Sequence, residues 1–291
     1  MDSRRSHWGA AQWAAYFEHQ SLPVMARSKR LLEALEESCG ERLSPKDLAD
    51  IVVQDPMLCL LLLREAERRK TSRLGRETTT ALAALLQLGV RRFRQLLMDS
   101  PEVDAGNAGL LRVEMRASLA AHIARAWSTG RMDVNPDEVA VAALLGGTGD
   151  LLLWAYAPEL PARAEEELHS GRAQRSAQAQ RQACGFTFKD LTLLCAERWG
   201  LPALVIQLLR GAETLRARLT RTCSNAARHI LDTSDSATLA LACDLLEAAE
   251  LIPNVSLDWL AEALVGLPEE RRQAALDEAK RQLAERAGPT P

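Results

Sequence analysis

The sequence has 291 residues, of which 47% are hydrophobic, 26% are charged and only 4% are aromatic. This is the composition of a globular protein, and the chain is long enough for one large domain or two small ones. Its apolar residues are mainly helix-forming aliphatics, so we expect an all-α protein. The net charge of −3 with both signs interspersed offers no concentrated positive field for phosphate backbones, so we expect no direct nucleic-acid partner.

Targeting and redox signals are also weak in this sequence. The residues after Met1 are polar, and the strongly apolar run from Met57 to Leu63 is too short to cross a bilayer. We therefore expect a cytoplasmic protein without membrane insertion. The six cysteines and five histidines are scattered, without the close pairs typical of zinc sites or disulfide frameworks, so we expect reduced thiols, no metal and no cofactor.

The first part of the chain shows helical spacing with clear start signals. Ser44-Pro45 and Asp55-Pro56 each place a capping side chain before a proline, which is typical of a first helical turn. The stretch from Ser100 to Gly109 contains Pro101, Gly106 and Gly109 and predicts a linker. Helices are expected at about residues 8–19, 22–40, 44–54, 55–70, 78–88 and 90–99.

The remainder of the chain continues the helical pattern. Asn135 before Pro136 predicts another capped helix, which runs to a glycine turn at Gly146. The polar, Arg- and Gln-rich stretch 165–181 predicts an exposed helix or a mobile connection. Further helices are expected at about 111–127, 135–145, 151–156, 188–199, 203–209, 215–231, 237–249, 256–264 and 268–287. We predict a two-lobed bundle, with an N-terminal lobe over 1–110, a second lobe over 111–231 and a C-terminal helical extension over 232–291.

Ordered sequence blocks point to a family. Leu22-Pro23-Val24 resembles the opening "LP" of the HDOD family, and Leu48–Leu58, which contains Asp55-Pro56, resembles its "isqDPaL" signature. Thr80–Gly89 resembles its "sisxAixxLG" helix, and Trp199–Pro202 its "WglP". The resemblance covers about residues 22–228 and implies a bacterial regulatory relative of the HD-type metal-dependent phosphohydrolases, with a helical fold and a degenerate HD-like second lobe.

The resemblance also shows where metal ligands would lie in an active HD enzyme. The first His would fall near Ala117, the His-Asp pair at Gly146 and Gly147, a further His near Phe188 and the late Asp near Asn225. Divalent ions need several directional donors, and four of these five residues have no ligand atom in their side chains. The resemblance therefore implies a protein that is not an enzyme of the ancestral kind.

Several residues allow two interpretations. The run Gly146–Gly149 is either an anion-binding backbone nest or a tight turn between helices, and the absence of a following Lys-Ser/Thr favours the turn. Asp150, beside it, is expected to be a solvated helix cap. Trp127, Trp154 and Trp199 either border a pocket or fill the core. Cys184 and Cys195 are either redox sensors or buried structural thiols, and the burial preference of cysteine favours the second.

Two functions follow from this pattern. The first is a noncatalytic, bacterial-type signal-transduction regulator or scaffold that binds a signalling protein through helical surfaces, with the groove between the lobes as the interface. The alternative is a sensor that binds a nucleotide, such as a cyclic dinucleotide, or another small molecule in the vacated HD pocket around Ala117, Gly146, Phe188 and Asn225. A residual enzyme would need replacement metal ligands, which the sequence does not offer.

Overall fold

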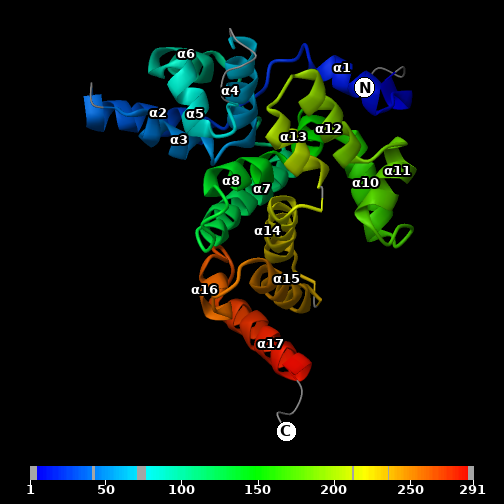
Figure 1. The fold of residues 1–291 in the computed structure, drawn as a ribbon. Coiled ribbons are helices and arrows are strands. Elements are labelled where there is room, and N and C mark those ends of the chain that lie inside the picture. Colours follow the sequence, from blue (N-terminus) through cyan, green and yellow to red (C-terminus); the bar gives the residue numbers. More distant parts are fainter. Residues whose placement is uncertain (1–4, 41–42, 71–76, 212, 235, 288–291) are drawn as a thin grey trace.

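A computed structural model describes residues 5–40, 43–70, 77–211, 213–234 and 236–287. Within these ranges the regular structure is helical, with one isolated bridge between Val24 and Glu102 and no strand. The all-α fold is therefore confirmed. Figure 1 shows α15, α16 and α17 beyond α14 at one end of the molecule, and α1 beside α12 at the other.

The elements follow one another with short connections. Up to residue 128 they are η1 (Arg5–His7), α1 (Ala10–Phe17), α2 (Ala26–Cys39), α3 (Pro45–Val52), α4 (Pro56–Arg68), α5 (Ala81–Leu88), α6 (Val90–Asp99) and α7 (Ala108–Ser128). From residue 136 they are α8 (Pro136–Leu145), α9 (Thr148–Tyr156), α10 (Glu159–His169), α11 (Ser176–Cys184), α12 (Phe188–Arg198), α13 (Ala203–Arg210), α14 (Leu215–Leu231), α15 (Ala237–Leu251), α16 (Leu257–Glu262) and α17 (Glu269–Ala287).

The predicted helix starts are confirmed by their capping bonds. Ser44 accepts a hydrogen bond from the Asp47 amide at the start of α3, and Asn135 accepts one from Asp137 at the start of α8. Asp55 accepts hydrogen bonds from two amides in the first turn of α4. Such side chains satisfy amides that have no partner inside the helix, which fixes where each helix begins.

Helix α7 contributes to two separate hydrophobic cores. Leu110 and Val113, near its start, belong to the core that also contains residues of α1 to α5, α9 and α12. Ile123 and Trp127, near its end, belong to a second core formed with α14, α15, α16 and α17. The helix is therefore a central element that fixes both cores relative to one another.

The C-terminal helices are integral to the second core. Trp127 is fully buried, and its indole Nε1 donates a 2.9 Å hydrogen bond to the carbonyl oxygen of Leu260 in α16. Leu241 and Leu245 of α15 are likewise fully buried. Residues beyond 231 thus complete the packing around the end of α7.

The first helix packs away from the helices that follow it. Helix α1 lies against α12, within residues 111–231 (Figure 1). Its rings meet Tyr156 at the end of α9, with ring centroids 5.7 Å apart for Phe17 and 6.3 Å apart for Tyr16. The residues expected in the N-terminal lobe and those expected in the second lobe thus share one core, and the domain boundaries stay a prediction.

One stretch is longer and more apolar than the sequence reasoning anticipated. Pro136–Tyr156, which comprises α8 and α9, has the length and composition of a membrane-crossing helix. In the structure it is broken at Gly146-Gly147, and 72% of its most apolar window is buried against other helices. Its apolar side chains therefore pack in the protein core.

Candidate functional site

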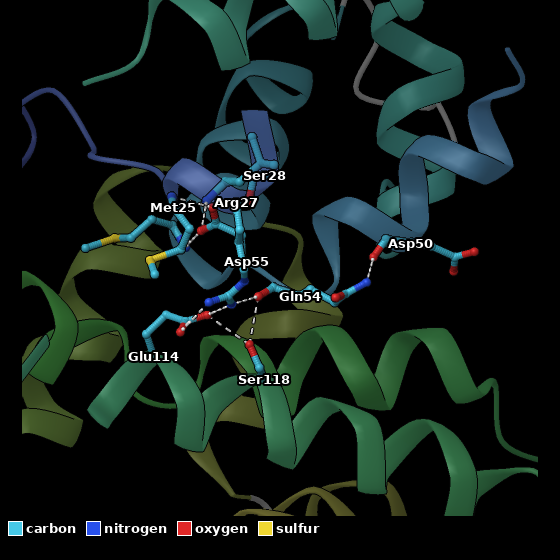
Figure 2. A network of polar contacts seen from close by, with 10 residues as sticks. Met25, Arg27, Ser28, Asp50, Gln54, Asp55, Glu114 and Ser118 are labelled. Carbon is cyan, nitrogen blue, oxygen red and sulfur yellow. Dashed lines mark hydrogen bonds and ion pairs between the residues drawn. The ribbon is translucent and has the colours of Figure 1, made fainter. Parts of the chain in front are cut away.

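Asp55 anchors the junction between α2 and α4 (Figure 2). Its carboxylate is completely buried and accepts hydrogen bonds from the Met25 amide and the Ser28 hydroxyl, both at 2.8 Å. It also accepts the capping bonds from the amides of Met57 and Leu58. A buried carboxylate is stable in this position because each of its oxygens is hydrogen-bonded. The Asp-Pro signature therefore has a structural role.

A second polar cluster joins α2 and the end of α3 to α7. The Arg27 guanidinium pairs with Glu114 and donates to the Gln54 carbonyl oxygen at 2.7 Å. Ser118, one turn further along α7, donates to the same carbonyl oxygen, also at 2.7 Å. Burial raises the pKa of Glu114, and the guanidinium of Arg27 opposes that rise. This cluster holds the first helices on α7, as Figure 2 shows.

A groove of about 480 Å³ opens beside this cluster, and we call it the interlobe groove because its lining includes residues of both predicted lobes. Its apolar wall includes Met115 and Val265, whose side chains are 54% and 41% exposed. Arg125 crosses its rim, where it pairs with both Asp50 and Asp137. The groove is lined by Asp50, Val53, Gln54, Met115, Ser118, Leu119, Ala121, His122, Arg125, Ala140, Ile230, Leu231, Val265 and Gly266.

The glycine turn of the HD position joins α8 to α9. Gly149 allows α9 to approach α12 closely, because a Cβ there would clash with the Phe188 carbonyl oxygen and lie 3.0 Å from the Thr192 nitrogen. The Gly149 amide donates to the Thr192 hydroxyl at 2.9 Å. Around Gly147, by contrast, a Cβ would have only an ordinary contact at 3.7 Å. The required glycine is thus Gly149, while Gly146 and Gly147 form a tight turn between α8 and α9.

A larger groove, of about 780 Å³, lies over this turn, and we call it the basic groove. Helix α7 and helices α9 to α14, with the segments before α9, α11 and α12, contribute residues to it. Its lining contains five cationic side chains and two carboxylates. The lining residues are Arg116, Gly146, Gly147, Asp150, Leu168, Gln174, Arg175, Ser176, Ala177, Gln180, Arg181, Thr187, Phe188, Lys189, Asp190, Thr192, Leu209 and Arg228.

The structure brings three of the five vestigial HD positions together. Gly146, Gly147 and Phe188 line the basic groove. Ala117 is 5% exposed and packs in the first core, directly after the groove residue Arg116. Asn225 is half-buried outside the lining, and its Oδ1 accepts a 3.5 Å hydrogen bond from Arg228. Three of the five positions that the resemblance predicts for HD ligands therefore lie on the basic groove.

These residues do not fit a hydrolytic metal. Asp150 is the nearby carboxylate, and it is paired with Arg116 at 2.8 Å instead of being a solvated cap as expected. Burial raises the pKa of Asp150, and the charge of Arg116 opposes that rise. In the part of the chain that the structure describes, no group of three or more His, Cys, Asp or Glu side chains is arranged to hold a metal. A cation here would lack the donors it needs.

The three tryptophans considered as pocket residues lie in the packed interior. Trp127 belongs to the second core, as described above. Trp154 covers Gly109, where no Cβ would fit, and the Arg112 guanidinium lies 5.8 Å from its ring centroid. Trp199 lies beneath Arg64, at 5.6 Å. All three indoles are placed away from the linings of the two grooves.

Comparison with known protein families shows to which family the chain belongs. The model of the HDOD domain matches residues 23–214, which is more than half of the chain. The chain belongs to the HDOD family. The sequence matches none of the curated proteins compared with it.

Two solved structures show the same fold as this HDOD protein. A virulence factor from Campylobacter jejuni subsp. jejuni has a TM-score of 0.69 at 14% identity, over 94% of this chain and 100% of the other. The MmoQ response regulator from Methylococcus capsulatus has a TM-score of 0.61 at 20% identity, over 89% of this chain and 98% of the other. Both identities are low, so these likenesses establish the fold and its extension beyond residue 214.

Sequence reasoning missed the cations of the basic groove in this HDOD chain. Arg175 and Arg181 lie in the stretch 165–181 that was interpreted as an exposed helix or a mobile connection. The structure divides that region between α10 and α11 and places both arginines on the groove. The local excess of arginine over acidic residues in 172–181 was the available signal.

Proposed function

We propose that this HDOD protein is a noncatalytic regulator of signal transduction that binds another protein through the interlobe groove. The observation that carries the proposal is the combination of a vacated HD centre with an apolar, partly exposed groove between α3, α7 and α14. Exposed apolar residues beside a polar rim are typical of protein interfaces. The chain would act in the cytoplasm, on a signalling partner, without a metal or cofactor.

The noncatalytic part of the proposal has a direct test. We expect the purified protein to contain no stoichiometric transition metal and to hydrolyse no phosphodiester when manganese, iron or magnesium is added. The physical reason is that Gly146, Gly147 and Phe188 supply no ligand where the chemistry needs imidazole and carboxylate groups. Metal analysis and a phosphodiesterase assay measure this. Turnover together with one bound metal per chain would overturn it.

The binding part is tested by charge placed in the interlobe groove. The variants Met115→Glu and Val265→Glu put a carboxylate on the apolar wall, and we expect each to abolish capture of the partner by affinity pull-down. Met132→Glu is the matched control, because Met132 is fully exposed and is absent from the lining of the groove. All three proteins should have the same circular dichroism. Equal capture by all three would contradict the proposed interface.

A second function, a small-molecule sensor at the vacated HD position, is favoured by one observation. The groove there is open, and the five cationic side chains in its lining outnumber the two carboxylates. Pockets of this size are typical of sites for small ligands. Binding here would be separate from protein binding in the interlobe groove, so each can be tested without the other.

A further inference from the structure

We propose that the basic groove binds a phosphate ester of nucleotide size, held by Arg175 and Arg181 and by the uncapped start of α11. This inference rests on the second function proposed above and names its ligand class. Four properties of the groove support it: the charge of its side chains, the two cations that are available to a ligand, the helix start in its lining and its volume.

The first argument is charge. The whole chain has a net charge of −3, yet the groove has an excess of three positive side chains, because its cations are Arg116, Arg175, Arg181, Lys189 and Arg228 and its acids are Asp150 and Asp190. Such a local field, in a hollow with protein walls, attracts anions. The groove is thus an exception to the mixed charge of the rest of the chain.

The second argument is that only some of these cations are free to bind an anion. Arg116 is paired with Asp150, Lys189 donates to the Arg210 carbonyl oxygen, and Arg228 contacts Asn225. Among the described residues, the guanidinium groups of Arg175 and Arg181 have no ion-pair or hydrogen-bond partner. Guanidinium groups bind phosphate through paired hydrogen bonds, so these two are the primary contacts.

The remaining acid offsets one of these cations, and the excess of three positive side chains already includes it. Asp190 accepts a hydrogen bond from the Thr187 amide, within the capping box of α12. Its carboxylate is thus held at the start of α12.

The third argument is the backbone. Gly147, Arg175 and Thr187 are the N-cap residues of α9, α11 and α12, and all three line the groove. The starts of α9 and α11 have no capping side chain. Amides at the start of a helix carry partial positive charge and bind phosphate oxygens. At α12 the Phe188 and Asp190 amides already donate to side chains, and at α9 the Gly149 amide donates to Thr192. It is therefore the uncapped start of α11 that adds to the field of the two arginines.

The fourth argument is size and surface. A volume of about 780 Å³ is much larger than an inorganic ion needs and lies within the range of pockets for small organic ligands. Leu168, Phe188 and Leu209 add apolar surface to the lining. A ligand that has both phosphate and a flat, weakly polar ring uses the cations and this surface together, which favours a nucleotide over free phosphate.

The experiment measures binding by isothermal titration calorimetry with the full chain. The probes are GTP, a cyclic dinucleotide, inorganic pyrophosphate and guanosine. We expect at least one phosphorylated nucleoside to bind with a Kd below about 1 mM, more tightly than pyrophosphate or guanosine. The affinity should fall as NaCl is raised, because the contacts are electrostatic. Tighter binding of guanosine than of every phosphorylated probe would agree with a small-molecule sensor in this groove but would overturn the proposal that its ligand is a phosphate ester.

The decisive variant is Arg175→Glu/Arg181→Glu, which reverses the two unpaired cations. We expect at least about a tenfold loss of affinity, since hydrogen bonds to charged groups are lost. Arg30→Glu/Arg91→Glu has the same change of net charge at exposed sites outside the groove and should retain binding. Both proteins should melt as the parent does. Equal affinity in the two variants, or no binding by any phosphorylated probe, would overturn the proposal.

Discussion

Burial sets the reactivity of the thiols. Desolvation raises the pKa of Cys184 to about 11 and that of Cys195 to about 12. Both are therefore protonated at neutral pH, which argues against the redox-sensor interpretation, because the thiolate is the reactive form. Cys243, in contrast, is exposed.

This difference predicts the order of alkylation. In a Cys39→Ser background at pH 7.5, we expect iodoacetamide to label Cys243 first, as read by mass spectrometry of peptides. The rate at Cys184 should increase about tenfold for each pH unit toward 11, because the thiolate fraction does. Labelling of Cys195 as fast as Cys243 at pH 7.5 would contradict the assignment.

Asp55 is a polar side chain whose loss should be costly, because its carboxylate is buried and fully hydrogen-bonded. Asp55→Ala removes a helix cap and leaves the Met25 amide and the Ser28 hydroxyl buried without an acceptor. We expect a loss of about 3 kcal/mol in the free energy of unfolding, the sum of about 1 for the cap and about 2 for the buried donors. Urea denaturation measures it. Ser256→Ala, which removes an exposed cap of α16, should cost only about 1 kcal/mol.

At the scale of the helices, the two partners of the ion pair between α2 and α7 should differ in how much stability is lost when each is removed. Glu114 is 5% exposed and Arg27 is 37% exposed. Arg27→Ala leaves a buried, unpaired carboxylate, and we expect a cost of about 2 kcal/mol, after allowance for screening. Glu114→Ala leaves a guanidinium that can reach water and should cost about 1 kcal/mol. Arg30→Ala on the same helix is the control, and equal costs for the first two would refute the argument.

The approach of α9 to α12 depends on one glycine. Gly149→Ala forces the Phe188 carbonyl or the helix to move, and we expect a loss of about 2 kcal/mol or more. Gly147→Ala has room and a negative φ of −96° that alanine can adopt, so its effect should stay within about 0.5 kcal/mol. Thermal and chemical denaturation compare the two. A larger loss of stability in Gly147→Ala than in Gly149→Ala would contradict a close approach of α9 to α12 at Gly149.

The helices were predictable where their signals are local. Ser44, Asp55 and Asn135 were identified as starts because a cap and a following proline are adjacent in sequence. Pro161 lies in the first turn of α10, where proline is tolerated. The helices α10 and α11 are separated at Gly171, whose φ is +73°.

The grooves were not predictable in the same way. Arg116, Arg181 and Arg228 come from three helices separated by long stretches of sequence, and nothing in the local pattern indicates that they share one hollow. The resemblance to HDOD proteins did locate the centre of that hollow, through Gly146, Gly147 and Phe188. It did not indicate the charge, because the cations differ from the expected ligand positions.

At the scale of the whole molecule, the C-terminal helices are required for the second core. A chain that ends at residue 231 loses the partners of Trp127 and the buried leucines of α15. We expect it to bind a hydrophobic dye and to melt without a sharp transition, since a large apolar surface becomes exposed. A chain that ends at residue 267 loses only α17 and should still melt cooperatively, at a lower Tm. An unchanged Tm for the shorter chain would show that 232–291 is an independent appendage.

The position of α7 has a mechanical consequence. Arg116 faces the basic groove, while its neighbours Met115 and Ser118 face the interlobe groove. One helix thus forms a wall of both grooves. A substitution that displaces α7 should therefore change the shape of both grooves together, whereas a substitution at Arg175, Arg181 or Val265, which lie outside α7, should change one groove alone.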